Sequence, residues 1–116
     1  MIREKYTDDE RYLLADRIWQ RLGSQRFSLM TGCKIVSYGE KDGKVFLLMS
    51  VGKNGMGIGL FEVAYDEGRE LYDVSFMRRN GTVMSVIANY SGVCLDILHT
   101  LFARHTGSGS CFMIAA

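Results

Sequence analysis

The sequence lacks long apolar runs, an excess of charge and a targeting segment. Its apolar runs, such as residues 45–49, are far too short to cross a bilayer, and the N-terminal MIREKYTDDE has no apolar stretch typical of a signal peptide. The 14 Lys and Arg nearly balance the 13 Asp and Glu, so no overall charge attracts nucleic acid, an anionic membrane or an acidic substrate. We therefore expect a cytoplasmic protein with no membrane partner.

Cysteine is also scarce. Cys33, Cys94 and Cys111 are an odd number without C-x-x-C spacing, which favours free thiols in a reducing compartment over disulfides or zinc ligands. His99 and His105 are six residues apart and do not share a helix face, so they add no metal site. We predict no metal and no cofactor, and Cys33 is more typical of a small core residue than of a nucleophile.

Motifs that identify a reaction are missing. There is no G-x-S-x-G, and the Gly-rich stretch GKNGMGIG, residues 52–59, does not fit a phosphate-binding loop because Lys53 precedes the glycines. Its spacing also differs from G-x-G-x-x-G. We interpret this stretch as a mobile loop, assign no catalytic residue and predict that the chain is not an enzyme.

Two hairpin motifs predict most of the strands. Residues 70–90 alternate like two strands around Asn80-Gly81, which predicts a type I′ turn with Arg79 opposite Thr82 and Val74 opposite Ile87. A second signal, Asp42-Gly43, joins a strand at 34–38 to one at 45–51. Residues 27–36 predict a strand bent at Thr31-Gly32, and residues 58–65 predict a strand after the Gly-rich loop.

Helices are expected at both ends of the chain. The Thr7 and Glu10 pair predicts a capping box for a helix that ends near Leu22 and Gly23. Ser91-Gly92 can cap a second helix, which Gly107 ends and whose apolar stripe is Cys94, Ile97, Leu98, Leu101 and Phe102.

The fold class that follows is α+β, a single domain over residues 1–116 with four to six antiparallel strands and both helices on one face of the sheet. Residues 1–6 and 108–116 are expected to be loose tails.

Binding residues are predicted on the two segments with the least apolar content to bury, which are the Gly-rich loop and the hairpin tip. These residues are Lys53, Met56, Ile58, Arg78 and Arg79. Met56 and Ile58 could insert into a partner or a second copy of the chain, or could fold back on the domain's own core.

One further set of motifs runs along the chain: Leu22-Gly23, Arg26-Phe27, Met30-Thr31-Gly32, Lys34, Gly52-Lys53-Asn54, Leu71-Tyr72-Asp73-Val74-Ser75-Phe76 and Thr106-Gly107. This set resembles a family of small proteins from phages and mobile elements, in which a bend usually reads Met-Thr-Gly-Ala-Lys. Cys33 takes the alanine position here. The resemblance implies an accessory protein that binds a host or phage protein in the host cytoplasm, for example as an inhibitor of a defence system. A nucleic-acid-binding module using Lys34, Lys53, Arg78 and Arg79 is the alternative, and a homodimer stays open.

Overall fold

The computed structural model of the chain describes residues 5–107. Its first helix, α1 (Asp8–Leu22), begins at the predicted capping box. The Thr7 hydroxyl accepts a hydrogen bond from the Glu10 N–H at 3.2 Å, and the Thr7 N–H donates to the Glu10 carboxylate at 2.8 Å. Gly23, with a φ of 123°, follows the last helical residue. The helix buries the stripe Leu14, Ala15, Ile18 and Leu22.

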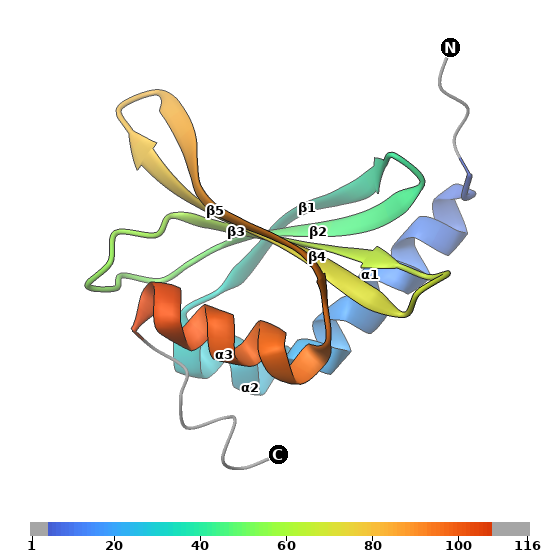
Figure 1. The fold of residues 1–116 in the computed structure, drawn as a ribbon, viewed down its shortest axis with the longest axis horizontal. Helices are drawn as coiled ribbons and strands as arrows, with labels where there is room; N and C mark the ends of the chain where they lie inside the picture. The colour runs from blue at the N-terminus through green and yellow to red at the C-terminus, as the bar shows by residue number, and fades with distance from the viewer. Residues whose placement is uncertain (1–4, 108–116) are drawn as a thin grey trace.

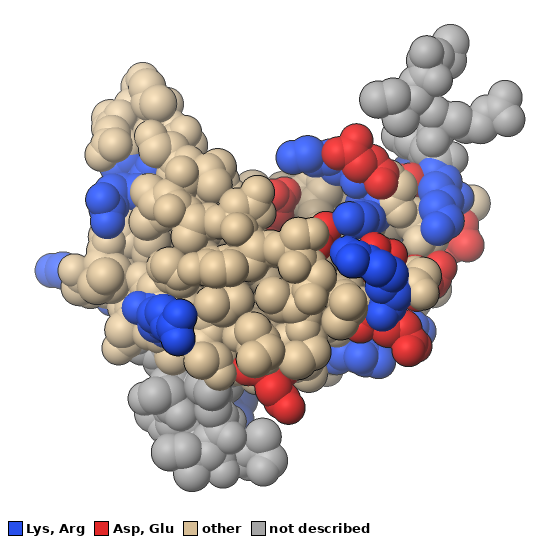
Figure 2. Space-filling model, in the orientation of Figure 1, with Lys and Arg blue, Asp and Glu red and all other residues tan. Residues whose placement is uncertain are grey.

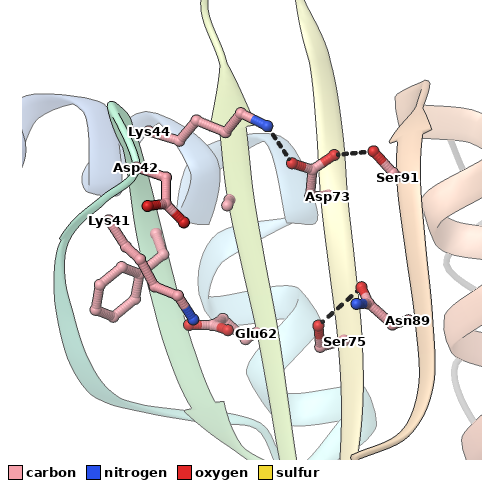
Figure 3. Close-up of a pocket in the computed structure, with 10 residues that line it drawn as sticks. Lys41, Asp42, Lys44, Glu62, Asp73, Ser75, Asn89 and Ser91 are labelled. Carbon is pink, nitrogen blue, oxygen red and sulfur yellow. Dashed lines mark hydrogen bonds and ion pairs between the residues drawn. The ribbon is translucent and has the colours of Figure 1, made fainter.

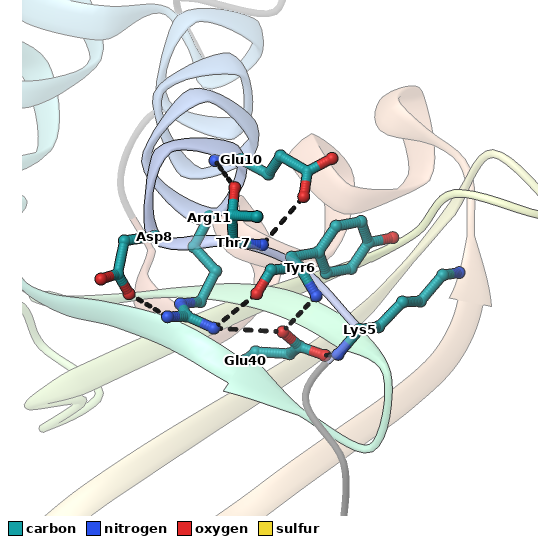
Figure 4. A network of polar contacts seen from close by, with 7 residues as sticks. All are labelled: Lys5, Tyr6, Thr7, Asp8, Glu10, Arg11 and Glu40. Carbon is teal, nitrogen blue, oxygen red and sulfur yellow. Dashed lines mark hydrogen bonds and ion pairs between the residues drawn. The ribbon is translucent and has the colours of Figure 1, made fainter.

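The residues just before α1 are anchored to the sheet (Figure 4). The N–H groups of Lys5 and Tyr6 donate to the Glu40 carboxylate at 2.6 and 3.0 Å, and the Arg11 guanidinium donates to the Tyr6 carbonyl at 2.8 Å while also pairing with Asp8. Burial raises the pKa of Glu40, but these hydrogen bonds and Arg11 outweigh it and lower the pKa. The expected loose tail is therefore wrong for Lys5 and Tyr6, and its other residues, 1–4, lie outside the described residues, as do 108–116.

Helix α2 (Ser24–Thr31) occupies the first half of the stretch 27–36 that we predicted as a strand, so that prediction is wrong there, whereas residues 34–36 do begin a strand. Phe27 and Thr31 lie one helical turn apart and are both buried, and the Thr31 hydroxyl donates to the Phe27 carbonyl at 2.6 Å. Gly32 ends the helix in the left-handed conformation, with φ 72°. An apolar run this short fits a buried strand and a buried helix equally well, so periodicity could not separate them.

Five antiparallel strands form one sheet in the order of the sequence (Figure 1). Asp42 and Gly43 both have positive φ, 54° and 76°, between the paired residues Lys41 and Lys44, so the first predicted hairpin turn is confirmed. The strands are β1 (Lys34–Lys41), β2 (Lys44–Ser50), β3 (Leu60–Asp66), β4 (Leu71–Asn80) and β5 (Val83–Val93).

The central hairpin is present, but its predicted register is wrong. Asn80 pairs with Val83, so the turn is centred on Gly81-Thr82, and Gly81 has the positive φ, 65°, that a type II′ turn needs at its first central position. Arg79 consequently lies opposite Met84 instead of Thr82.

Two irregularities in the β4–β5 pairing shift the register further along the hairpin. The moved turn and the bulge between Phe76 and Met77 together place Val74 opposite Tyr90 instead of Ile87, and Ile87 is exposed. Such bulges bend the strand and increase its twist, which agrees with the way the hairpin tip lifts away from the helices in Figure 1.

The helices all lie on the same side of the sheet, as predicted, and enclose the core (Figure 1). Helix α1 packs on β1 and β2, and the last helix, α3 (Leu95–Thr106), packs on β4. Four phenylalanines from both layers form the centre of the core, with ring centroids 4.9 to 5.1 Å apart for neighbouring pairs. They are Phe27, Phe61, Phe76 and Phe102, all fully buried.

Helix α3 begins later than we expected. Ser91 and Gly92 lie within β5, so they do not cap the helix, and Cys94 is the N-cap without a side-chain hydrogen bond. Ile97 is 48% exposed and lies outside the buried stripe, whereas Gly107 ends the helix as predicted. Across residues 5–107, none of the helices combines the length and the apolar character needed to span a membrane.

Candidate functional site

One end of the sheet collects segments that are distant in the sequence. Lys34 lies opposite Ser50, Ser50 opposite Leu60, and Leu60 opposite Met77. The start of β1, the Gly-rich loop after β2 and the β4–β5 hairpin tip therefore meet at this end, and α3 finishes there too (Figure 1). We call it the basic end and define it as residues 32–35, 51–60, 77–86 and 103–107.

The basic end has only positive charges. It holds five Lys and Arg and no Asp or Glu, so all thirteen carboxylates lie in the rest of the chain. In Figure 2 blue groups stand alone on the left, whereas red and blue are interspersed on the right. The balanced total charge thus conceals a strong separation of charge along the molecule. The five side chains are Lys34, Lys53, Arg78, Arg79 and Arg104, all exposed.

Asn54 fixes the shape of the Gly-rich loop. Its side-chain N–H group donates to the carbonyls of Gly52 and Ile58 at 2.8 and 2.9 Å, and its side-chain oxygen accepts from the N–H groups of Met56 and Ile58 at 3.2 and 3.1 Å. We expected a mobile loop, whereas four hydrogen bonds from one side chain hold it in a defined conformation. The sequence gave no sign of this role beyond an asparagine among glycines.

The loop and the hairpin tip are also joined to each other. The Arg78 guanidinium donates to the Met56 carbonyl at 2.8 Å, and the Gly59 N–H donates to the Met77 carbonyl at 2.9 Å. Met56 is 49% exposed, whereas Ile58 is only 3% exposed and belongs to the core. Of the two apolar residues predicted to reach a partner, only Met56 is therefore presented to one.

Exposed aliphatic side chains stand among these charges. Met56 on the loop, Val83 and Val86 on β5, and Ile35 on β1 are all exposed at the basic end. Side chains of this kind gain free energy when a partner removes them from water. The basic end therefore offers both charge and apolar area.

A separate pocket lies on the sheet face that the helices do not cover (Figure 3). Its volume is about 260 Å³, and every strand contributes to it. We call it the sheet-face pocket. Small outward-facing side chains on the inner strands leave the hollow between larger neighbours. Its lining residues are Lys41, Asp42, Lys44, Phe46, Glu62, Ala64, Asp73, Ser75, Asn89 and Ser91.

Asp73 is the most engaged side chain of this pocket. It pairs with the Lys44 ammonium at 2.6 Å and accepts hydrogen bonds from the Ser91 hydroxyl at 3.1 Å and the Gly92 N–H at 3.0 Å. Burial raises the pKa of Asp73, but these three donors outweigh it and lower the pKa. The hydrogen bond to Asp73 raises the pKa of Lys44, so both groups stay charged near neutral pH.

The remaining candidates for chemistry are held in the core or paired. Burial raises the pKa of Cys33 to about 11, which keeps its thiol protonated and confirms it as a core residue. Burial lowers the pKa of His99 and of His105, and the His105 ring lies 2.6 Å from the Tyr90 hydroxyl. Within residues 5–107, no three His, Cys, Asp or Glu side chains group together in a way that could hold a metal ion.

The sheet-face pocket had a partial signal in the sequence. Asp73 and Ser75 alternate with buried residues on β4, so a period of two in the sequence puts both on the face turned away from the core. Glu62 and Ala64 alternate in the same way on β3. Only the strand order, which periodicity does not give, brings these positions together.

No protein-family model matches the chain, and comparisons with curated proteins and with solved structures give no match either.

Proposed function

We propose that this chain is a non-enzymatic binding module that docks on an acidic surface of a partner protein through its basic end. The observation that carries the proposal is the concentration of five exposed cations, without one carboxylate, at an end of the sheet where Asn54 and Arg78 hold the Gly-rich loop in place. Binding residues commonly lie on loops that a rigid scaffold positions. Like charges gathered in this way attract a partner of opposite charge and speed its association.

The aliphatic groups among the cations favour a protein over nucleic acid. Met and Arg are enriched at protein interfaces, and exposed Met56 and Val83 gain by burial against another protein. Proteins that bind single-stranded nucleic acid use exposed aromatic rings for base stacking. The large exposed apolar side chains of the basic end are aliphatic instead of aromatic.

Nucleic acid is the second candidate because the four cations considered for it, Lys34, Lys53, Arg78 and Arg79, do lie at one end. Neutralised phosphates release counterions, so such binding would weaken steeply with salt. An enzyme has less support, since Cys33 is buried and protonated and His105 is engaged by Tyr90.

Affinity capture from bacterial lysate, with and without phage infection, tests the proposal, because the phage resemblance makes host proteins, defence systems included, the first partners to examine. The double variant Lys53→Glu, Arg79→Glu reverses exposed charge without touching the Arg78 contact. Arg17→Glu, Arg21→Glu is the matched control, since it makes the same change in net charge on exposed positions of α1.

We expect a protein that wild type and control both retain and that the first variant loses. Equal retention by all three chains would contradict the proposal. Titration of duplex and single-stranded DNA at increasing salt separates the second candidate. Tight binding of DNA that weakens steeply with salt, together with capture that nuclease treatment abolishes, would identify nucleic acid as the partner instead of a protein. The absence of DNA binding at low salt would remove that candidate.

A further inference from the structure

The sheet-face pocket is independent of the basic end. None of its lining residues belongs to the four segments that define the basic end, and it opens on the face opposite the helices. A ligand there would be recognised by different chemistry, so the pocket can be judged whether or not the basic end binds a partner.

Charge within the pocket favours a cation. Lys44 and Asp73 neutralise each other at 2.6 Å. The other ionisable groups that line the pocket are Lys41, Asp42 and Glu62, which leave one net negative charge. The whole chain has a formal net charge of +1, so this hollow is locally of the opposite sign.

Glu62 is the group best placed to bind that cation. It is half-buried on β3, with Leu48 opposite on one side and Ser75 on the other. Ser75 donates to the Asn89 side-chain oxygen at 3.2 Å, so its hydroxyl hydrogen is engaged elsewhere. Among the described side chains that line the pocket, hydrogen bonds and ion pairs join Lys44, Asp73, Ser75, Asn89 and Ser91. The Glu62 carboxylate is outside this set, so its acceptor oxygens are available to a ligand.

Phe46 gives the pocket a flat apolar wall. Its ring lies over Gly39, where an added Cβ would be 3.1 Å from two ring atoms, so the absence of a side chain at Gly39 makes room for the ring. A guanidinium is planar and weakly hydrated, stacks on aromatic faces and donates paired hydrogen bonds to one carboxylate. A compact ammonium cannot make the paired contact.

We propose that the sheet-face pocket binds a guanidinium group, with Glu62 accepting its N–H donors and the Phe46 ring as the surface on which it stacks. The group belongs either to a free small molecule or to an arginine side chain of a partner protein. The chemistry of the pocket is the same for both.

Amide chemical shifts of the full chain, titrated with ethylguanidinium and with ethylammonium, test the proposal. We expect saturable shifts from ethylguanidinium that map to residues 44–46, 62–64, 73–75 and 89–91, and clearly weaker binding of ethylammonium. Glu62→Gln should weaken ethylguanidinium by at least about tenfold, because it removes both charge and paired acceptors. Glu70→Gln removes the same charge from an exposed position outside the pocket and should bind like wild type.

A blocked peptide, Gly-Gly-Arg-Gly-Gly, distinguishes the two sources of the group. A pocket that serves a partner's arginine takes the peptide at least as tightly as ethylguanidinium, and a pocket for a free molecule takes only the small ligand. Equal affinity for ethylguanidinium and ethylammonium, shifts that map to another surface, or a Glu62→Gln variant that folds and binds like wild type would each overturn the proposal.

Discussion

The Arg78 guanidinium donates a hydrogen bond to the Met56 carbonyl at 2.8 Å, which joins the hairpin tip to the Gly-rich loop across 22 positions of sequence. A Cβ on Gly57 would come within 3.3 Å of the Arg78 Nε, so the side chain lies directly over the loop backbone. Arg78 thus has a structural role, whereas Lys53 and Arg79 are exposed cations of the loop and the hairpin tip.

Asn54 should contribute measurably to stability because one side chain satisfies four backbone groups. We expect Asn54→Ala to lower the free energy of unfolding by about 1 to 3 kcal/mol and to speed hydrogen exchange at Met56 and Ile58. Asn80→Ala, at the exposed hairpin tip, is the control, with a change within about 0.5 kcal/mol. Equal effects in chemical denaturation would show that Asn54 does not hold the loop.

Gly32 and Gly52 should be hard to replace, since their backbones touch. A Cβ on Gly32 would lie 2.7 Å from the Gly52 Cα, and φ at Gly32 is 72°. Gly43, with φ 76° and no atom near its Cβ position, separates conformational strain from collision. We expect Gly43→Ala to cost about 1 kcal/mol and Gly32→Ala about 3 kcal/mol or more, with Gly32→Val at least as damaging.

Gly55→Ala completes this series. Gly55 has neither a positive φ nor a neighbour within 4 Å of its Cβ position, so the cost should stay within about 0.5 kcal/mol. Chemical denaturation of the alanine variants checks the order. A Gly32→Ala protein as stable as Gly43→Ala would contradict the close approach.

Cys33 and Cys94 should differ sharply in reactivity. Cys33 is buried with its pKa raised to about 11, whereas Cys94 is exposed. Iodoacetamide at pH 8 should label Cys94 in the folded protein and leave Cys33 unlabelled until denaturant is added, because the thiolate is the reactive form. Mass spectrometry of digested peptides reads both sites. Fast labelling of Cys33 in the folded state would contradict its place in the core.

The two histidines should make the fold sensitive to mild acid. Burial lowers the pKa of His99 and His105 below the ordinary 6.5, so the unfolded chain binds protons first as the pH falls. The contribution of the two neutral imidazoles to the free energy of unfolding is complete above pH 6.5 and is lost as the pH falls through their folded pKa values. The loss is about 1.4 kcal/mol for each unit by which the folded pKa lies below the unfolded pKa.

Proton NMR titration of the imidazole rings and denaturation at pH 7.5, 6.5 and 5.5 measure this effect. Carboxyl groups with lowered pKa values, such as that of Asp73, change the stability only at lower pH, because the ordinary pKa of an aspartate is 3.8. Stability that stays constant from pH 7.5 to 5.5, or a ring that titrates above pH 6.5, would contradict the burial of these groups.

Local signals explain which parts of the fold the sequence predicts. The Thr7 and Glu10 capping box and the Asp42-Gly43 turn depend on residues close in sequence, and both are confirmed. The strand predicted at residues 27–36 failed over residues 27–31 because so short an apolar run fits a buried helix as well as a buried strand. The central hairpin was found, but the turn at Gly81-Thr82 and the bulges in β5 give it a different register.

The candidate sites depend even more on distant contacts. The sequence pointed to Lys53, Met56, Arg78 and Arg79 as loop residues, but only the strand order shows that they share an end free of carboxylates. Ile58 could not be distinguished from Met56, because Asn54 turns the loop so that one of them is buried and the other exposed.

Site-specific photocrosslinking in bacterial lysate tests the central claim, that the basic end is the binding surface, most directly. A photoreactive residue replaces Met56 at the basic end or, as a control, Ile97 in the first turn of α3, and the two positions are almost equally exposed, at 49% and 48%. We expect a discrete protein adduct from position 56 that Lys53→Glu, Arg79→Glu abolishes, and none from position 97. An adduct from position 97 alone, or one from position 56 that survives the charge reversal, would contradict this claim.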